Sequence, residues 1–166
     1  GERLALDPAS IYGQYKVKAE QRVLELCPDS VHLRASWMYD LPGYGLPIRG
    51  NLPLNLLRAA LKGEALRFSR NDHRGVTYVR QVIENLEPAM ALPGGVYNFG
   101  SGNAENMVCT ARQFAETLGI AVQIEEESWG RNLVMDTTKL ERFGIRFDTT
   151  HQGIQRCLKD YGLRTL

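Results

Sequence analysis

The amino-acid sequence predicts a protein of the α/β class. Short apolar runs typical of strands alternate with helical patterns along its 166 residues, and this alternation is typical of helices packed on a mostly parallel sheet. Hydrophobic residues make up 43% of the chain and charged residues 23%, an ordinary composition for a globular protein. The length is sufficient for one domain with its own core.

The expected elements follow one another closely. They are a helix over residues 11–27, a strand over 31–36, a loop over 37–49, a helix over 54–61, a strand over 65–68, a strand or turn over 76–79, a helix over 81–91, a strand over 96–99, a helix over 110–118, a strand over 122–124, and two short C-terminal helices in LERFG and HQGIQRCLKDYG. Ser10 is suited to cap the first helix and Gly63 to end the second. Thr137 or Thr138, and then Thr150, are suited to cap the last two.

The loop over residues 37–49 is the segment where we expect function and any boundary between domains. It is rich in glycine and proline and contains three aromatic residues. Long irregular loops of this kind often carry binding or catalytic groups.

Charge and hydropathy argue against several classes of protein. The net charge is +1, from 20 basic and 19 acidic side chains, which is no electrostatic footprint for nucleic acid or an anionic membrane. No apolar stretch approaches the roughly 20 residues that span a bilayer. The first ten residues, GERLALDPAS, lack the layout of a secretory signal. We therefore expect a cytoplasmic protein that binds neither nucleic acid nor membranes.

The cysteines predict neither a disulfide framework nor a metal site. Cys27, Cys109 and Cys157 are widely spaced, odd in number and without a CxxC pair. We expect three free and mostly buried thiols, as in a protein of a reducing compartment.

The sharpest chemical motif is a tyrosine and a lysine four residues apart. Tyr12 and Lys16 lie on the predicted first helix, so their side chains share one helical face. An ammonium near a phenol stabilises the phenolate, and the phenol can then donate a proton to a carbonyl oxygen as hydride reaches the carbon. The spacing by itself also fits an exposed helix with a tyrosine packed at its start.

Five segments cover nearly all of the chain in order: PASIYGQYKVKAEQ, LRASWMYD, RGVTYVRQVIENL, VYNFGSGNAENMVCTARQFAETLG and NLVMDTTKLERFGIRFDTTHQGIQRCL. Together they resemble the extended short-chain dehydrogenases/reductases, most closely the dTDP-4-dehydrorhamnose reductases. The first resembles the family's P-x-x-x-YG-x-S/T-K-x-x-x-E segment, and the last its closing LDxSKL stretch.

The resemblance implies a fold and a cofactor. The fold would be the C-terminal part of a Rossmann-like NAD(P)-binding fold, here residues 1–36, followed by a small α/β domain for the nucleotide-sugar substrate, mainly residues 37–166. The cofactor would be NADPH or NADH. Tyr12 would be the catalytic acid, and Lys16 its partner and a ligand of the cofactor ribose. No metal is implied.

The resemblance also implies a set of substrate-binding residues. Trp37, Thr77, Tyr78 and Arg131 match or lie near positions that face the sugar nucleotide, and Arg74 lies close to them in the sequence. Arginine suits a diphosphate because its planar guanidinium pairs with two phosphate oxygens at once. The aromatic residues equally suit core positions, and the two arginines equally suit a solvated surface.

The family's glycine-rich phosphate-binding turn does not occur in this sequence. No GxxGxxG or GxGxxG pattern is present, and only 11 residues precede Tyr12. We therefore expect this chain to be a fragment, whose activity is best measured in a longer parent protein. Its first helix and first strand would keep an apolar face, which we expect a second copy of the chain, a swapped element or a missing N-terminal segment to cover.

Three functions follow from the resemblance. The first is reduction of a 4-keto-6-deoxy sugar nucleotide by the parent enzyme. The second is epimerisation or dehydration of a sugar nucleotide, in which the hydride returns to the substrate. The third is a non-catalytic role like that of the regulatory subunit of methionine adenosyltransferase, because a fold does not guarantee chemistry. Departures from the family at Tyr15, Asp40, Gln81 and the Gly130–Arg131 pair weaken any choice of sugar.

Overall fold

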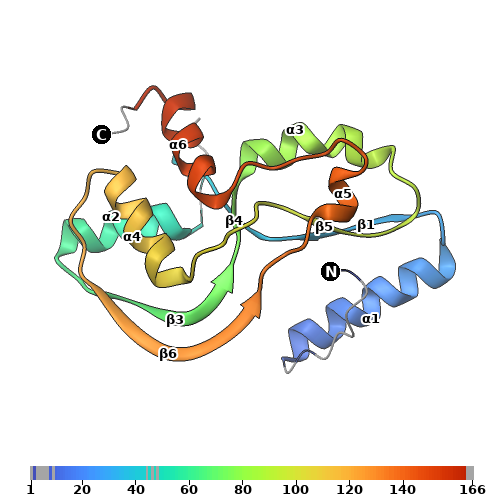
Figure 1. Ribbon diagram of the computed structural model, residues 1–166, viewed down its shortest axis with the longest axis horizontal. Helices are drawn as coiled ribbons and strands as arrows, with labels where there is room; N and C mark the ends of the chain where they lie inside the picture. The colour runs from blue at the N-terminus through green and yellow to red at the C-terminus, as the bar shows by residue number, and fades with distance from the viewer. Residues whose placement is uncertain are drawn as a thin grey trace.

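The structure, a computed structural model, describes residues 2, 8, 10–43, 45, 47 and 49–163. Helices and strands alternate along this part of the chain, which confirms the α/β class (Figure 1). The elements are α1 (Ile11–Leu26), β1 (Val31–Ala35), β2 (Trp37–Tyr39), α2 (Leu52–Lys62), β3 (Leu66–Arg74), β4 (Val76–Tyr78), α3 (Val79–Met90), β5 (Gly95–Phe99), α4 (Met107–Thr117), β6 (Ile124–Leu133), α5 (Thr138–Glu141) and α6 (Thr150–Asp160).

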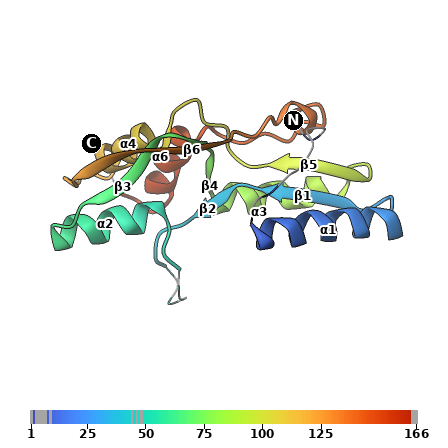
Figure 2. The ribbon, with the colours of Figure 1, turned by 90° about the horizontal axis from the view of Figure 1, so that it is seen from below.

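These strands form three parallel pairs, β1 with β5, β2 with β4, and β3 with β6. Parallel partners need long crossover connections, which explains why each pair joins segments far apart in the sequence. In Figure 1, α1 lies on one side of the β1–β5 pair, and α3 and α5 lie on the other. Figure 2 shows α2 and α4 beside the β3–β6 pair, at the opposite end of the molecule from α1.

Two hydrophobic clusters hold these layers together. The larger lies among β2, β4, α2, α4 and α6 and has Tyr39, Leu56 and Phe114 at its centre. Phe114 meets the Tyr39 ring edge-on at a centroid distance of 5.4 Å. The smaller cluster packs β5 against α3 and α5, around Tyr97 and Leu140. β1 lies before position 36, the expected boundary between the two parts, and its partner β5 lies well after it. The β1–β5 pair therefore joins segments from both sides of that boundary.

The predicted helix ends are largely confirmed. Ser10 caps α1 by accepting a hydrogen bond from the Gly13 amide at 3.1 Å, and Gly63 ends α2 in the left-handed conformation with φ 67°. The last helix differs by one residue, because Thr149 rather than Thr150 is its N-cap. The buried Thr150 hydroxyl instead accepts from the Val76 amide at 3.0 Å, and so ties α6 to β4.

The strands were the less accurate part of the sequence prediction. β2 lies within the predicted loop, and β3 and β6 are far longer than the runs of apolar residues that indicated them. Both long strands are rich in charged residues, which have a low intrinsic propensity for β-strands. Their pairing supplies what propensity lacks, since Arg67 on β3 donates to Glu125 on β6 at 2.9 Å.

The three cysteines are free, as expected, but only one is fully buried. Cys157 lies in the larger core, Cys109 is partly buried, and Cys27 is exposed. Burial raises the pKa of the Cys157 thiol to about 12, so this thiol stays protonated and unreactive at neutral pH. The expectation of burial was therefore wrong for Cys27, which follows the last turn of α1.

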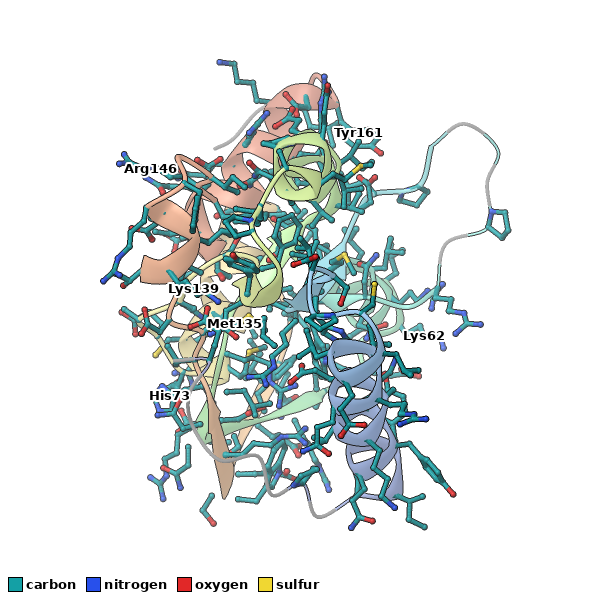
Figure 3. All side chains as sticks on the ribbon, turned by 90° about the vertical axis from the view of Figure 1, so that its right-hand side faces the viewer. Lys62, His73, Met135, Lys139, Arg146 and Tyr161 are labelled. Carbon is teal, nitrogen blue, oxygen red and sulfur yellow. The ribbon has the colours of Figure 1, made fainter. Side chains whose placement is uncertain are left out.

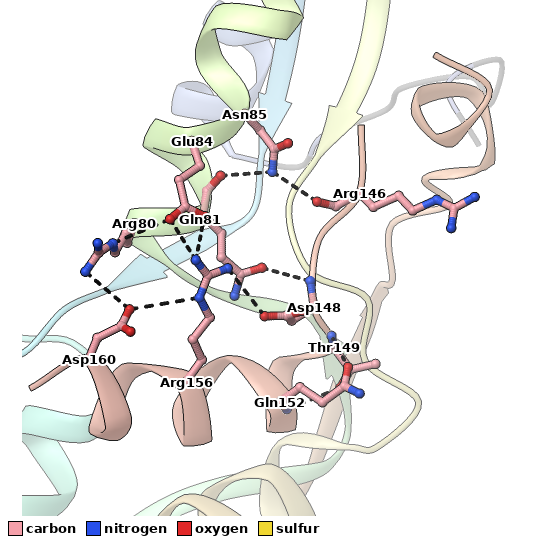
Figure 4. Close-up of polar contacts among 10 residues, drawn as sticks. All are labelled: Arg80, Gln81, Glu84, Asn85, Arg146, Asp148, Thr149, Gln152, Arg156 and Asp160. Atoms are coloured by element: carbon pink, nitrogen blue, oxygen red, sulfur yellow. Dashed lines mark hydrogen bonds and ion pairs between the residues drawn. The ribbon is translucent and has the colours of Figure 1, made fainter. Parts of the chain in front are cut away.

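An ion-pair network fastens α6 to α3 (Figure 4). Arg156 on α6 donates to both carboxylate oxygens of Glu84 on α3 at 2.7 Å and lies 3.7 Å from Asp148. The Gln81 side-chain carbonyl accepts a hydrogen bond from the Asp148 backbone amide at 2.8 Å, so Gln81 bridges α3 to the segment before α6. Several partly exposed pairs that share one arginine stabilise more than an isolated surface pair does.

Lys139 joins α5 to β5. Its ammonium donates to the Val96 carbonyl at 2.7 Å and lies 3.9 Å from the centroid of the Tyr97 ring. Figure 3 shows Lys139 on the opposite side of the molecule from Lys62, which ends α2. No helix in the described part of the chain has the length and apolar character to cross a membrane.

We expect Gly75→Ala to lower the free energy of unfolding by about 1–3 kcal/mol, as overpacking of a filled site does. A Cβ at Gly75 would lie 1.8 Å from the Ser101 carbonyl oxygen, so one of the two backbones would have to move. Gly102→Ala is the matched control, because a Cβ there meets nothing within 4 Å. Urea unfolding midpoints measure the difference; equal midpoints for the two variants would contradict the close approach.

Candidate functional site

Two cavities meet at the carboxyl end of β1. One, of about 710 Å³, lies between α1 and β1, and the other, of about 360 Å³, lies between β1 and the end of β6. Both are lined by the same run of residues, 34–37. Ligands of open parallel sheets bind outside the carboxyl ends of the strands, so this is the place in the fold where a binding site is expected.

Tyr12 and Lys16 both line the larger cavity. They stand one turn apart on α1, and the Lys16 ammonium lies 5.6 Å from the centroid of the Tyr12 ring. The Tyr12 side chain is 72% exposed, so its hydroxyl is accessible to a molecule in the cavity. The structure thus brings together the two residues that the motif predicted would share one face.

Glu20 continues the stripe of Tyr12 and Lys16 one turn further and anchors α1 to β1. It is the one buried residue of α1, all of which is described. Its carboxylate receives two hydrogen bonds from the Arg34 guanidinium, at 2.8 Å and 2.5 Å. These bonds lower the pKa of Glu20, and His32 lies 3.6 Å from the same carboxylate. Arg34 lines both cavities, so this ion pair also shapes the site.

Trp37 and Arg74 lie against each other between the cavities. The carbon of the Arg74 guanidinium is 4.0 Å from the centroid of the Trp37 ring. Arg74 is buried and is held by Asp72, whose two carboxylate oxygens it reaches at 2.7 Å. Trp37 borders both cavities and keeps 59% of its surface exposed. The Trp37 indole therefore forms one wall of both cavities, and the buried Arg74 guanidinium supports it.

Arg131 is the more accessible of the two candidate arginines. It pairs in register with Asp72 across β3 and β6, and its Nε lies 3.9 Å from that carboxylate. Its side chain is 56% exposed. Asp72 therefore faces two guanidinium groups, one buried and one open to solvent.

Thr77 and Tyr78 lie inside the protein and line neither of the two cavities. The Thr77 hydroxyl contacts Ser36 and accepts from the Ser101 amide at 2.8 Å. Tyr78 stacks on Tyr39 with a centroid distance of 6.0 Å, and burial raises the pKa of its phenol. In this arrangement both residues face the interior, where they hold the strands that carry the site.

Sequence reasoning missed several residues of the cavities. Ser36 lines both, next to Trp37, and Asn98 and Met135 line the smaller one. The position of Ser36 directly after an alternating strand was a usable signal, because strand ends carry ligands in this class of fold. Asp72, which lies outside the cavities but holds Arg74, had no sequence signal, because its contacts with Arg74 and with Arg131 on β6 follow from the tertiary structure.

Comparisons with known proteins identify the family of this chain. A match to the family described as the RmlD substrate binding domain spans residues 2–162. The chain belongs to the RmlD substrate binding domain family. A curated relative is the spore coat polysaccharide biosynthesis protein SpsK of Bacillus subtilis (strain 168), which is 25% identical over 161 residues. The match covers 96% of this chain and 51% of the relative, so the chain spans about half the length of that protein.

Solved structures similar to this RmlD-family chain include two enzymes with bound nicotinamide cofactors. The dTDP-4-dehydrorhamnose reductase of Bacillus anthracis str. Ames, in complex with NADP, has a TM-score of 0.81 at 19% identity, over 96% of this chain and 57% of that one. The UDP-glucose 4-epimerase of Thermus thermophilus, in complex with NAD, has a TM-score of 0.73 at 21% identity, over 98% and 58%. These likenesses confirm the Rossmann-like fold, and the family match confirms the predicted family resemblance.

We expect the Glu20–Arg34 pair to stabilise the protein in a pH-dependent way. Because the folded pKa of Glu20 is lowered, its contribution is present at neutral pH and is lost as the pH falls through that lowered value. Glu20→Gln should lower the free energy of unfolding by about 1–3 kcal/mol at pH 7, the scale of a charged hydrogen bond. The difference from the natural protein should begin to shrink once the pH falls below the ordinary glutamate pKa of about 4.3. It should approach zero only at a pH below the lowered pKa of Glu20, where the folded carboxyl is protonated.

Urea unfolding at both pH values measures this difference. Glu25→Gln is the matched control, since Glu25 pairs with Arg22 on the exposed side of the same helix and should contribute little at either pH. An equal loss for Glu20→Gln at both pH values would show that packing, rather than charge, is what the substitution removes.

Proposed function

We propose that the protein to which this chain belongs is an NAD(P)H-dependent reductase of a 4-keto-6-deoxy sugar nucleotide. The observation that carries the proposal is the cavity in which Tyr12, Lys16 and Trp37 meet at the carboxyl end of β1. Membership of the RmlD substrate binding domain family and the likeness to a dTDP-4-dehydrorhamnose reductase support it. The curated relative, a polysaccharide biosynthesis protein, fits the same field of chemistry.

The residues of the larger cavity fit a nicotinamide cofactor. Tyr12 offers a hydroxyl and Lys16 an ammonium to one cavity, and such groups suit the hydroxyls of a ribose. NADPH or NADH, when bound, supplies a hydride. Lys16 would hold the ribose, and the Tyr12 hydroxyl would donate its proton to the carbonyl oxygen of the sugar. The proton and the hydride together reduce the carbonyl to an alcohol.

The smaller cavity and its rim fit the sugar nucleotide. Trp37 would pack against the sugar. Arg74, which lines this cavity, and Arg131, which lies near Asp72 outside its lining, would be the cationic candidates for the diphosphate. Thr77 and Tyr78 would contribute by holding β4 in place. On this proposal, residues 1–36 belong to the dinucleotide-binding part of the protein and residues 37–166 mainly to the substrate-binding part. A cytoplasmic location and a homo-oligomer remain predictions.

We expect Tyr12→Phe to lower turnover of a 4-keto-6-deoxy sugar nucleotide by about 10²-fold or more, since it removes the proton donor. Tyr15→Phe is the matched control: Tyr15 lies on the same helix, is exposed, and is absent from the cavity. NADPH oxidation by the full natural protein, followed by absorbance, gives both rates. Equal rates for the natural protein and Tyr12→Phe would end the assignment of Tyr12.

Product analysis separates this reaction from its nearest rival. A likeness in fold to UDP-glucose 4-epimerase leaves epimerisation or dehydration as the second candidate. A reductase should consume one NADPH per molecule of product, whereas an epimerase or dehydratase should turn over with a trace of NAD because the hydride returns to the substrate. If no product forms with either NADPH or NAD, a non-catalytic role is favoured.

A further inference from the structure

The Asp72–Arg74 ion pair is set at the edge of the candidate site. The two residues are two apart on β3, so their side chains point to the same face of the strand. Both are almost fully buried, at 4% and 3% exposure. Arg74 donates to Asp72 through Nε at 3.2 Å and through Nη2 at 2.7 Å to each carboxylate oxygen. A buried charge is stable only when it is compensated in this way.

The held guanidinium in turn supports Trp37. A cation centred 4.0 Å from the indole centroid is within the range of a favourable cation–π contact. Asp72 itself is not among the residues that line the two cavities, whereas Arg74 and Trp37 both line the smaller one. Any effect of Asp72 on a molecule in these cavities must therefore act through a neighbouring side chain, and Arg74 and Trp37 are the neighbours that line the smaller cavity.

An irregularity between β3 and β6 decides which residues face Asp72. The register shifts between Ser69 and Asn71, which pair with Glu127 and Gly130. The extra residue on β6 brings Arg131 opposite Asp72. Only glycine fits at position 130, because a Cβ there would lie 2.3 Å from the Asn71 carbonyl oxygen.

We infer that Asp72 is a positioning residue of the sugar-nucleotide site: it holds Arg74 against Trp37 and so fixes the wall that the sugar meets. The inference rests on the proposed function for the identity of the ligand. Two of the Arg74 nitrogens are engaged by Asp72, so the role of Arg74 is to order the wall. Arg131 also lies near Asp72 but is exposed and lines neither cavity.

The first test measures the indole itself. These 166 residues contain two tryptophans, so in a protein of these residues Trp129→Phe leaves Trp37 as the single source of tryptophan fluorescence. In that background, Asp72→Asn removes the carboxylate with little change of shape and should release Arg74 from the ring. The acrylamide quenching constant of Trp37 should then rise by about twofold, because one face of the ring loses its cationic cover.

Two variants guard this measurement. Arg74→Lys keeps the charge but loses the planar, two-pronged group, so it should raise the quenching constant as Asp72→Asn does. Glu125→Gln breaks the exposed pair with Arg67 on the same two strands and should leave the constant unchanged. An unchanged constant for both Asp72→Asn and Arg74→Lys would overturn the inference.

The second test asks whether the wall selects the sugar. The dissociation constants of UDP-glucose and of UDP are measured by titration for the natural protein and for Asp72→Asn. Loss of the Asp72 charge affects both diphosphates alike, so the ratio of the two constants isolates the sugar. The preference for UDP-glucose over UDP should fall by about tenfold, a difference of about 1.4 kcal/mol.

The outcomes separate the inference from the proposed function. A loosened Trp37 with an unchanged ratio would overturn the claim that Asp72 acts on the sugar. Failure of the natural protein to bind either probe would count against the proposed function, while the quenching constants would still decide whether Asp72 holds the Arg74–Trp37 contact. If Asp72→Asn acts only by unfolding part of the protein, both affinities should fall together and their ratio should stay unchanged. That unchanged ratio would also overturn the inference that Asp72 acts on the sugar.

Discussion

Three chain segments cross at contact distance near the centre of the molecule, and the site depends on that crossing. The end of β1, the start of β4 and the end of β5 meet where Ser36, Thr77 and Ser101 exchange hydrogen bonds. Two glycines make the approach possible. A Cβ at Gly75 would strike the Ser101 carbonyl, and one at Gly100, with φ 152°, would lie 2.3 Å from the Ser36 hydroxyl. Gly75 is required because the two backbones approach closely, and Gly100 because of both the nearby Ser36 side chain and its positive φ.

This crossing explains why residues from distant parts of the sequence line one site. Ser36 leads directly into Trp37, Gly75 follows Arg74, and Asn98 lies just before Gly100. Holding the three strand ends together therefore brings the indole, its supporting guanidinium and a side-chain amide to the same cavity. A rigid support of this kind suits recognition, because a bound molecule need not order the residues that contact it.

Compensated charge is the second feature of the site. Two buried carboxylates, Glu20 and Asp72, each take a two-pronged arginine, Arg34 and Arg74. Each pair has little net charge, so it serves to orient the neighbouring side chains rather than to attract a charged ligand. One pair fastens the helix that carries Tyr12 and Lys16, and the other fastens Trp37. The two halves of the site are thus positioned by the same chemical device.

The sequence by itself determined the features that depend on local physics. Ser10 and the helical spacing after it specified α1, and the four-residue spacing alone put Tyr12 and Lys16 on one face. Resemblance across nearly the whole chain also identified the family. Only the tertiary structure decided that the charged strands β3 and β6 pair along their length, that Thr150 holds β4 instead of capping a helix, and that Asp72 supports Trp37. Each of these depends on partners that lie far apart in the sequence or on different strands, and local patterns contain no information about such partners.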